Sequence, residues 1–246
     1  MTAGWSDGGV QHADRPRSSP DREALAHQVR RLIAAAVQSP AGPAALAAAA
    51  GALASVADDL EGAVAEGTDP TGRPTPDGAR TDTAAGLAAA MPFDVVIGVS
   101  NPLALPITIA FEPPGAIGHA VFTAPYEGAP GCVHGAVLAG AFDIVLTAAN
   151  VVGGSAGPTR TLTLRYLRPT LVNTVSRFEA WVTSIEGRRI RSSGRLVQGG
   201  LVTVEADGEF VTLDRPLAAT GRSPVRSDGG PAIPYCGDGS GATAAR

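Results

Sequence analysis

Apolar residues recur at helical spacing in the first quarter of the chain. From residue 20 to 37 they fall every three to four positions, and Ser19 stands where it can cap the helix that this spacing predicts. Residues 44–65 show the same period after a break at Gly42-Pro43. We therefore expect a helical hairpin over 19–65. Its Ala-rich stripes bury little area, so it should pack on the main domain or on a partner subunit.

An apolar run of helix length occupies residues 134–150. Its only ionisable side chains are His134 and Asp143, and Gly153-Gly154 marks its end. A helix without a polar face is expected to be buried on all sides. Burying a carboxylate is unfavourable unless the group is hydrogen-bonded or used, so Asp143 is the first functional candidate. The slightly longer run from Cys132 to Val152 is long enough to span a membrane, but its central Asp argues against that.

Alternating apolar and polar positions surround this run and predict β-strands, two before the helix and four after it. The short connections at Glu186-Gly187 and Gly199-Gly200 require antiparallel neighbours. One antiparallel sheet wrapped around a single helix would explain why the helix is apolar all round, which gives an α+β fold. The expected strands are Leu105–Phe111, Ala116–Ala124, Thr159–Leu167, Val175–Ile185, Arg188–Gln198 and Leu201–Leu213.

The same pattern divides the chain into segments. Residues 1–18 are polar and Gly-rich and are expected to be disordered, as is the Pro/Gly/Ser-rich tail 215–246. Residues 66–90 have turn residues and no period, which indicates a linker. The main domain should then occupy 91–214.

The net charge and its distribution along the chain limit the classes of partner that the protein can bind. The net charge of −4 argues against general nucleic-acid binding. The charge is uneven, because residues 160–195 contain eight arginines against two glutamates, a net +6 that leaves −10 elsewhere. Such a strip fits an anionic small ligand, or else the arginines cover the solvated outer faces of strands. Arginine supplies all 19 cationic charges, which suggests GC-rich coding, so we give composition no functional weight.

The sequence does not support a disulfide framework, a zinc site or a serine nucleophile elbow. Cys132 and Cys236 do not form a disulfide framework, and Cys132 with His134 lacks the further ligands of a zinc site. Residues 153–157 match G-x-S-x-G, but a nucleophile elbow lies between a strand and the next helix, the reverse of the order expected here. We predict no metal, no cofactor and no membrane contact. We also predict a cytoplasmic location, since the chain begins without a secretory leader.

A set of spaced residues carries a family resemblance. His134-Gly135 is followed nine positions after the His by Asp143, and Thr159 lies seven positions before Tyr166 in the run TRTLTLRYLRP. Together with the order of elements, this set resembles the hotdog-fold acyl-CoA thioesterases of the PaaI/THEM4-like group.

The likeness covers residues 101–213. The leading hairpin and the run Asn101-Pro102-Leu103 also resemble actinobacterial members. Two positions depart from the pattern: Ala136 stands where many relatives have a second Gly, and Gly128 stands where some have an Asn. The second departure removes one possible oxyanion donor.

The resemblance implies roles for four residues. Asp143 would be the base or the nucleophile, and the Gly135 amide would stabilise the oxyanion at the positive end of the helix. Thr159 would be the polar partner of Asp143 that orients a water, or only a strand residue chosen for β propensity. His134 would assist at the oxyanion or only orient the loop.

Helix geometry adds a constraint. Asp143 lies eight residues after Gly135, roughly 12 Å along the axis, so one helix cannot bring both to one carbonyl. Two antiparallel helices from two subunits can, as in the hotdog dimers that this chain resembles, so the resemblance implies a site at a dimer interface, in a dimer or a dimer of dimers. Arg168, Arg188 and Arg189 are candidates for the phosphates of coenzyme A.

The predicted function is hydrolysis of acyl-CoA thioesters to a free acid and coenzyme A. The alternative is a non-catalytic hotdog protein that binds acyl-CoA as a sensor or accessory subunit. A hotdog dehydratase or hydratase usually has a different His/Asp or His/Glu arrangement, which the sequence does not show.

Overall fold

The structure, a computed structural model, describes residues 18–65 and 83–212. Its helices are α1 Pro20–Gln38, α2 Pro43–Ala65, α3 Ala84–Ala90 and α4 Gly135–Val152, with a short 3-10 helix η1 at Ala124–Tyr126. Its strands are β1 Ile107–Glu112, β2 Gly115–Val121, β3 Thr159–Tyr166, β4 Val175–Glu186, β5 Arg189–Gln198 and β6 Leu201–Val211. The expected disordered segments, apart from Ser18, and residues 66–82 of the expected linker lie outside the described residues.

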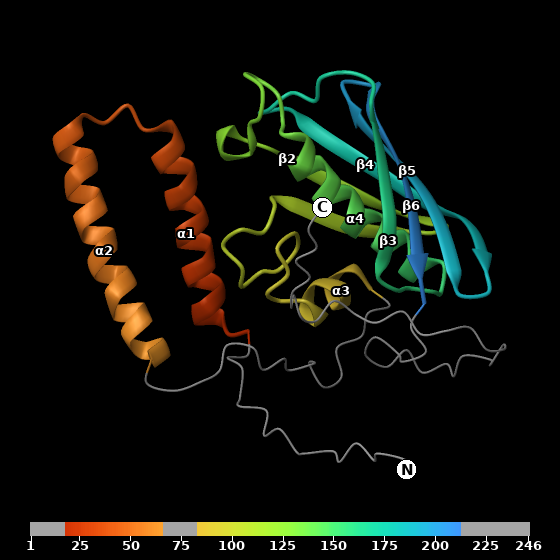
Figure 1. Cartoon of the computed structure of the whole chain (residues 1–246), viewed down its shortest axis with the longest axis horizontal. Helices are drawn as coiled ribbons and strands as arrows, with labels where there is room; N and C mark the ends of the chain where they lie inside the picture. Colours follow the sequence, from red (N-terminus) through yellow and green to blue (C-terminus); the bar gives the residue numbers. More distant parts are fainter. Residues whose placement is uncertain (1–17, 66–82, 213–246) are drawn as a thin grey trace, which may run out of the picture.

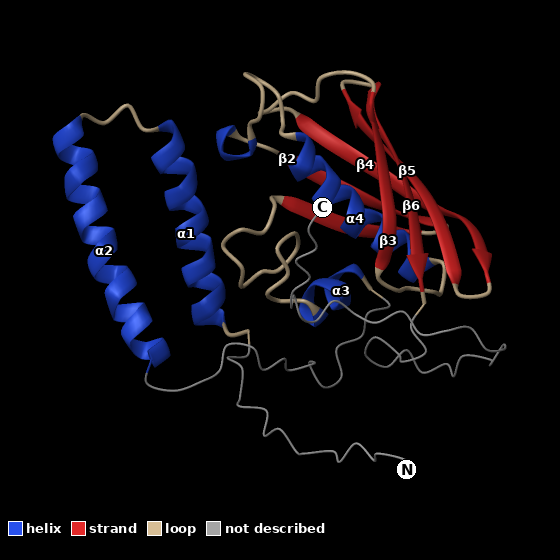
Figure 2. Cartoon of the chain, in the orientation of Figure 1, coloured by secondary structure: helices blue, strands red, loops and turns tan. Residues whose placement is uncertain are grey.

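The six strands form one antiparallel sheet in the order β1-β2-β4-β5-β6-β3, and the sheet curves around α4 (Figure 1). The helical hairpin α1–α2 lies to one side of this unit, as the colouring by secondary structure also shows (Figure 2). The predicted α+β architecture, a sheet around one central helix preceded by a helical hairpin, is confirmed.

The core lies between α4 and the concave face of the sheet. Phe142 is fully buried and meets the ring of Phe178 edge-to-face, with ring centroids 5.1 Å apart. Gly118 on β2 allows the helix to approach closely, because a Cβ there would lie 2.9 Å from Val145 Cγ2. By length and composition, both α4 and α2 could cross a membrane, but α4 serves here as the core helix. The buried residues of α4 are Leu138, Ala141, Phe142, Ile144, Val145, Leu146, Ala148, Ala149 and Asn150.

The position of β3 does not follow the order of the chain. The predicted antiparallel hairpins at Glu186-Gly187 and Gly199-Gly200 are confirmed, and all three glycines have positive φ. After β3, however, the chain crosses at Arg168-Pro169, so that β3 pairs with β6 and not with the next strand β4. One side of β3 is therefore left as an edge of the sheet.

The expected linker is partly wrong. Ala84–Ala90 forms the helix α3, and the Thr83 hydroxyl caps it by accepting a hydrogen bond from Gly86 N at 3.0 Å. Leu87 is 4% exposed and belongs to the core, so the packed region begins before Met91. A single Leu among alanines produces no periodicity, which is why the sequence pattern does not indicate this helix.

The helical hairpin is attached through α1. Ser19 caps this helix as predicted, accepting from Arg22 N at 3.2 Å. Arg30 Nη2 donates to three backbone carbonyls, those of Gly98, Val99 and Asn101, at 3.1, 3.0 and 2.7 Å. Burial raises the pKa of the Tyr126 phenol in neighbouring η1, an effect that the positive charge of Arg30 partly offsets.

Candidate active site

One face of α4 is not covered by the sheet. Asp143 lies midway along this face and is half-buried, so the prediction that the helix is buried on all sides is wrong. The sheet wraps only part of the helix circumference, and positions spaced by three or four residues remain open beyond its edge strand β3. This open stripe consists of Ala136, Gly140, Asp143, Thr147 and Val151, all half-buried except Ala136, which is exposed.

Thr159 is the polar partner of Asp143. Its Oγ1 donates to Asp143 Oδ1 at 2.5 Å, so the expected contact exists, while the role of the pair in catalysis stays a prediction. The strand register explains the contact. Thr161 and Thr163 point to the outer face of the sheet, and strict alternation would send Thr159 there as well. A register shift between Thr159 and Thr161 adds a residue and turns Thr159 inward towards α4.

His134 is the N-cap of α4. Its Nδ1 accepts a hydrogen bond from Ala136 N at 3.0 Å, so the proton of the neutral ring is on Nε2. This contact orders the start of the helix, while a role at the oxyanion or in orienting the loop stays a prediction. Gly135 N–H differs, because within the described ranges it donates to no acceptor. This amide is thus available at the positive end of the helix dipole.

Tyr166 contacts the first residue of α4, a role that was not predicted from the sequence. Its phenol donates to Gly135 O at 3.0 Å. A Cβ on Gly135 would lie 3.0 Å from the phenol oxygen and 3.2 Å from Cζ, so only glycine fits without moving the ring. The sequence signal was available, since Tyr166 is in the same inward register as Leu162 and Leu164.

A cleft of about 370 Å³ opens beside this helix start. Its walls are mainly apolar, with Arg168 as the charged group, so it can accept an apolar chain next to an anionic one. The lining residues are Cys132, Val133, Gly135, Leu138, Tyr166, Leu167, Arg168, Pro169 and Thr170. Cys132 is a free thiol.

The departure at Gly128 has a steric cause. A Cβ at this position would lie 3.0 Å from both the Cα and the Cδ2 of His134. An Asn side chain at residue 128 would therefore require His134 or the loop to shift by a few tenths of an ångström. The G-x-S-x-G match at 153–157 joins the end of α4 to β3, as expected of a turn and not of a nucleophile elbow.

The thioesterase superfamily model, 4HBT, matches residues 130–205, which include Gly135, Asp143 and Thr159. The crystal structure of RHA08564, a thioesterase superfamily protein, is 30% identical; the match covers 81% of this chain and 94% of that chain, with a TM-score of 0.65. This chain belongs to the thioesterase superfamily.

Two other matching structures are less similar to this chain. The Escherichia coli PaaI protein of the phenylacetic acid degradation operon is 20% identical, with 43% of this chain and 82% of that chain covered and a TM-score of 0.41. Zebra fish thioesterase superfamily member 2 is 14% identical, with 53% and 98% covered and a TM-score of 0.45. No curated protein matches the chain. The expected hotdog thioesterase family is confirmed, while the actinobacterial subgroup stays a prediction.

The three arginines expected to bind phosphate do not lie together in this thioesterase superfamily member. Arg168 lines the cleft and donates to Val202 O at 2.8 Å, near the end of β5. Arg188 donates to Thr212 O at 3.1 Å, and Arg189 pairs with Glu209 at 3.4 Å, both at the start of β5. Ten residues of strand separate these ends by roughly 30 Å. Of these three arginines, only Arg168 lines the cleft beside Gly135.

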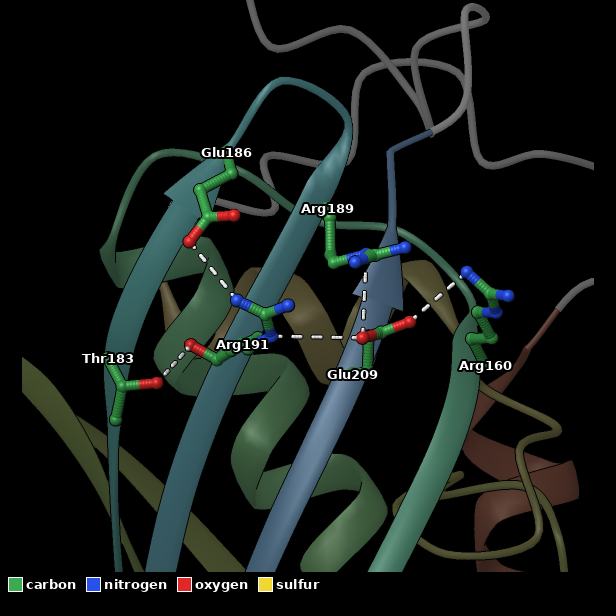
Figure 3. A network of polar contacts seen from close by, with 6 residues as sticks. All are labelled: Arg160, Thr183, Glu186, Arg189, Arg191 and Glu209. Atoms are coloured by element: carbon green, nitrogen blue, oxygen red, sulfur yellow. Dashed lines mark hydrogen bonds and ion pairs between the residues drawn. The ribbon is translucent and has the colours of Figure 1, made fainter. Parts of the chain in front are cut away.

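Carboxylates pair with much of the basic strip over residues 160–195. Glu209 on β6 pairs with Arg160, Arg189 and Arg191 at 3.2, 3.4 and 3.8 Å (Figure 3). Arg191 also pairs with Glu186 at 3.1 Å. At least six of the eight arginines contact a carboxylate in this way, namely 160, 165, 177, 189, 191 and 195.

For Arg168, which pairs with no carboxylate within the described residues, the anionic-ligand interpretation stays a prediction. The arginines that pair with carboxylates fit the alternative, solvated outer faces of strands. The reason is that β6 supplies Glu205, Asp207 and Glu209, three acids that lie outside the stretch in which the charge was counted.

Proposed function

We propose that this thioesterase superfamily member hydrolyses acyl-CoA thioesters to a free acid and coenzyme A. Superfamily membership supports thioester hydrolysis in general. The observation that carries the finer proposal is the hydrogen bond from Thr159 to Asp143 on the open face of α4. It presents a fixed carboxylate where a substrate and a water molecule can reach it.

Two chemical routes fit this pair. Thr159 occupies Asp143 Oδ1, which leaves Oδ2 to accept a proton from a water molecule. The hydroxide then bonds to the thioester carbon, the C–S bond breaks, and the thiolate leaves and takes up a proton. In the other route Asp143 itself attacks the carbon, the thiolate leaves, and water hydrolyses the resulting anhydride.

The oxyanion requires a donor that the same helix cannot supply. Gly135 N–H is unused within the described chain, but it lies roughly 12 Å along the axis from Asp143. A second copy with its α4 antiparallel to the first would bring its Gly135 next to Asp143. The open stripe of α4 and the unpaired edge of β3 are surfaces that such a copy could cover. We therefore place the proposed site between two subunits.

Arg168 is the best candidate for the phosphates of coenzyme A. Within the described residues it pairs with no carboxylate, and it lies beside Gly135 in the cleft. Arg189 is already paired with Glu209 and is less available. A guanidinium with free donors binds phosphate oxygens well.

The alternative, a hotdog protein that only binds acyl-CoA, was disfavoured on the sequence because a buried acid would be wasted in it. Asp143 is half-buried, however, so its burial costs less free energy than the sequence predicted. The two functions are separated by experiment. We would measure thiol release from acyl-CoAs of short to long chain with the wild type, Asp143→Asn and the matched control Asp207→Asn, which removes an exposed carboxylate on β6.

The proposal expects turnover by the wild type and by Asp207→Asn, and a loss of about 10²-fold or more in kcat for Asp143→Asn. Circular dichroism and binding of a non-hydrolysable acyl-CoA thioether should be unchanged in Asp143→Asn. Tight binding of intact acyl-CoA by the wild type without any thiol release would instead establish the binding function and overturn ours.

A further inference from the structure

One side of α1 rests on the loop 91–106, which joins α3 to β1. The residues on this side, Arg22, Ala26 and Arg30, are spaced by four positions and therefore lie one above the other along the helix. Ala26 is 1% exposed. Arg22 lies over the ring of Phe93 in the loop, with its guanidinium carbon 5.8 Å from the ring centroid. Figure 1 accordingly shows α1, and not α2, next to the main domain.

Arg30 binds the backbone of this loop. Its Nη2 donates to the carbonyls of Gly98, Val99 and Asn101, which follow a turn in which Gly98 N donates to Asp94 O at 2.9 Å. Carbonyls at the end of such a turn carry partial negative charge, so a guanidinium binds them strongly. The Nε of Arg30 is buried and meets no acceptor within the described part of the chain, which is unfavourable. This cost is typical of a side chain that is retained for a function rather than for stability alone.

The loop that Arg30 binds reaches α4 next to Asp143. Val96 in this loop is 9% exposed and belongs to the core. A Cβ on Gly140 would lie 3.6 Å from Val96 Cγ2, so Val96 packs beside the open stripe of α4. Gly140 and Asp143 are three residues apart and are neighbours on the helix surface. Asp94 Oδ1 fixes the turn that presents Val96, because it accepts hydrogen bonds from the backbone N of Val96 and Ile97 at 2.7 and 3.0 Å.

A second path runs from α1 through η1 to the start of α4. α1 packs against η1, in which Tyr126 meets the ring of Phe122 edge-to-face with centroids 5.7 Å apart. Burial raises the pKa of the Tyr126 phenol and the positive charge of Arg30 lowers it, so the two side chains are close enough to interact. The carbonyl of Tyr126 accepts a hydrogen bond from His134 N at 2.9 Å, and His134 is the N-cap that precedes Gly135.

We propose that Arg30 is a positioning residue that holds the loop 91–106 and η1 where they place Asp143 and Gly135 for reaction. It touches neither the substrate nor the reacting atoms and acts only through these two segments. The kinetic part of this inference rests on the proposed thioester hydrolysis, whereas the structural part does not. Because small displacements of a catalytic group are costly, a change in the seating of α1 should alter turnover.

Hydrogen exchange of the full-length protein tests the structural part. Arg30→Met keeps the apolar stem and removes the donors. Arg31→Met is the matched control, because Arg31 is exposed and donates to Gln28 of the same helix at 2.7 Å. We expect the amides of 94–101 and 126–138 to exchange about tenfold faster in Arg30→Met and as in the wild type in Arg31→Met. Unchanged exchange of β4 and β5 in both variants shows that the sheet is folded.

Arg30→Lys is a milder variant that retains the charge but not the planar fork, and it should accelerate the same two segments to a smaller extent. Acceleration confined to α1 and 94–101 would mean that Arg30 only attaches the helix, and it would overturn the proposal. Equal exchange of 126–138 in Arg30→Met and Arg31→Met would overturn it as well.

Thiol release from acyl-CoA tests the kinetic part. Arg30→Met should lower kcat about tenfold with KM within about twofold of the wild-type value, because the catalytic groups are displaced while substrate binding is retained. Arg31→Met should have wild-type kinetics. Wild-type kcat in Arg30→Met, or an equal loss in Arg31→Met, would contradict the positioning role. A wild-type protein that releases no thiol would instead contradict the proposed function, and the exchange measurements would still decide whether Arg30 holds η1 and the start of α4.

Discussion

The hydroxyl of Thr159 donates to Asp143 Oδ1 at 2.5 Å and so joins the edge strand to the central helix. This contact between residues sixteen positions apart depends on the register shift at the start of β3. The contact fixes Oδ1 of the carboxylate and leaves Oδ2 to take part in the proposed reaction. The position of Thr159 on β3 is therefore as important to that reaction as its hydroxyl.

Thr159→Val should lower kcat for thioester hydrolysis by roughly 10- to 100-fold. The variant keeps the β-branched shape but removes a hydrogen bond to a charged group, which is worth about 1.5–3 kcal/mol. Thr159→Ser retains the hydroxyl and should keep most of the activity. Thiol-release kinetics on the three proteins measure this difference. Full activity of Thr159→Val would show that the residue is present only for its strand propensity.

Gly135→Ala should reduce kcat/KM by roughly 10- to 100-fold although it retains the amide N–H, because small displacements of a catalytic group are costly. The new Cβ would lie 3.0 Å from the Tyr166 phenol oxygen and would displace the ring or the helix start. Tyr166→Phe removes that oxygen, so the double variant should recover part of the activity. If the losses of activity in the two single variants simply add in the double variant, the Tyr166 phenol is not what the new Cβ displaces.

Glu209→Gln should destabilise the fold by about 1 kcal/mol, more than an ordinary surface change, because three arginines share this carboxylate. Asp207→Asn is the control: its arginine partner, Arg165, retains Glu205, so the loss should be within about 0.5 kcal/mol. Urea unfolding at low salt gives both values. The difference between the variants should shrink in 1 M salt, and a difference insensitive to salt would rule out an ionic origin.

The sequence by itself determined most of the elements, with α3 as the exception. The apolar run before Gly153 predicted α4, and period-two alternation predicted all six strands with boundaries close to those observed. Ser19 predicted the start of α1. The family motif also identified the Thr159–Asp143 partnership. These features depend on residues that lie near one another in the chain or on a spacing that recurs in relatives.

Only the tertiary structure decided how these elements meet. It placed β3 at the edge of the sheet next to β6, left Asp143 on an open face, and brought Glu209 to Arg160, Arg189 and Arg191. The physical reason is that periodicity reports which side of an element is apolar, but not which distant strand will pair with it. Burial and ion pairing depend on that pairing of strands, so the exposure of Asp143 and the ion pairs of the outer face could not be derived from the sequence.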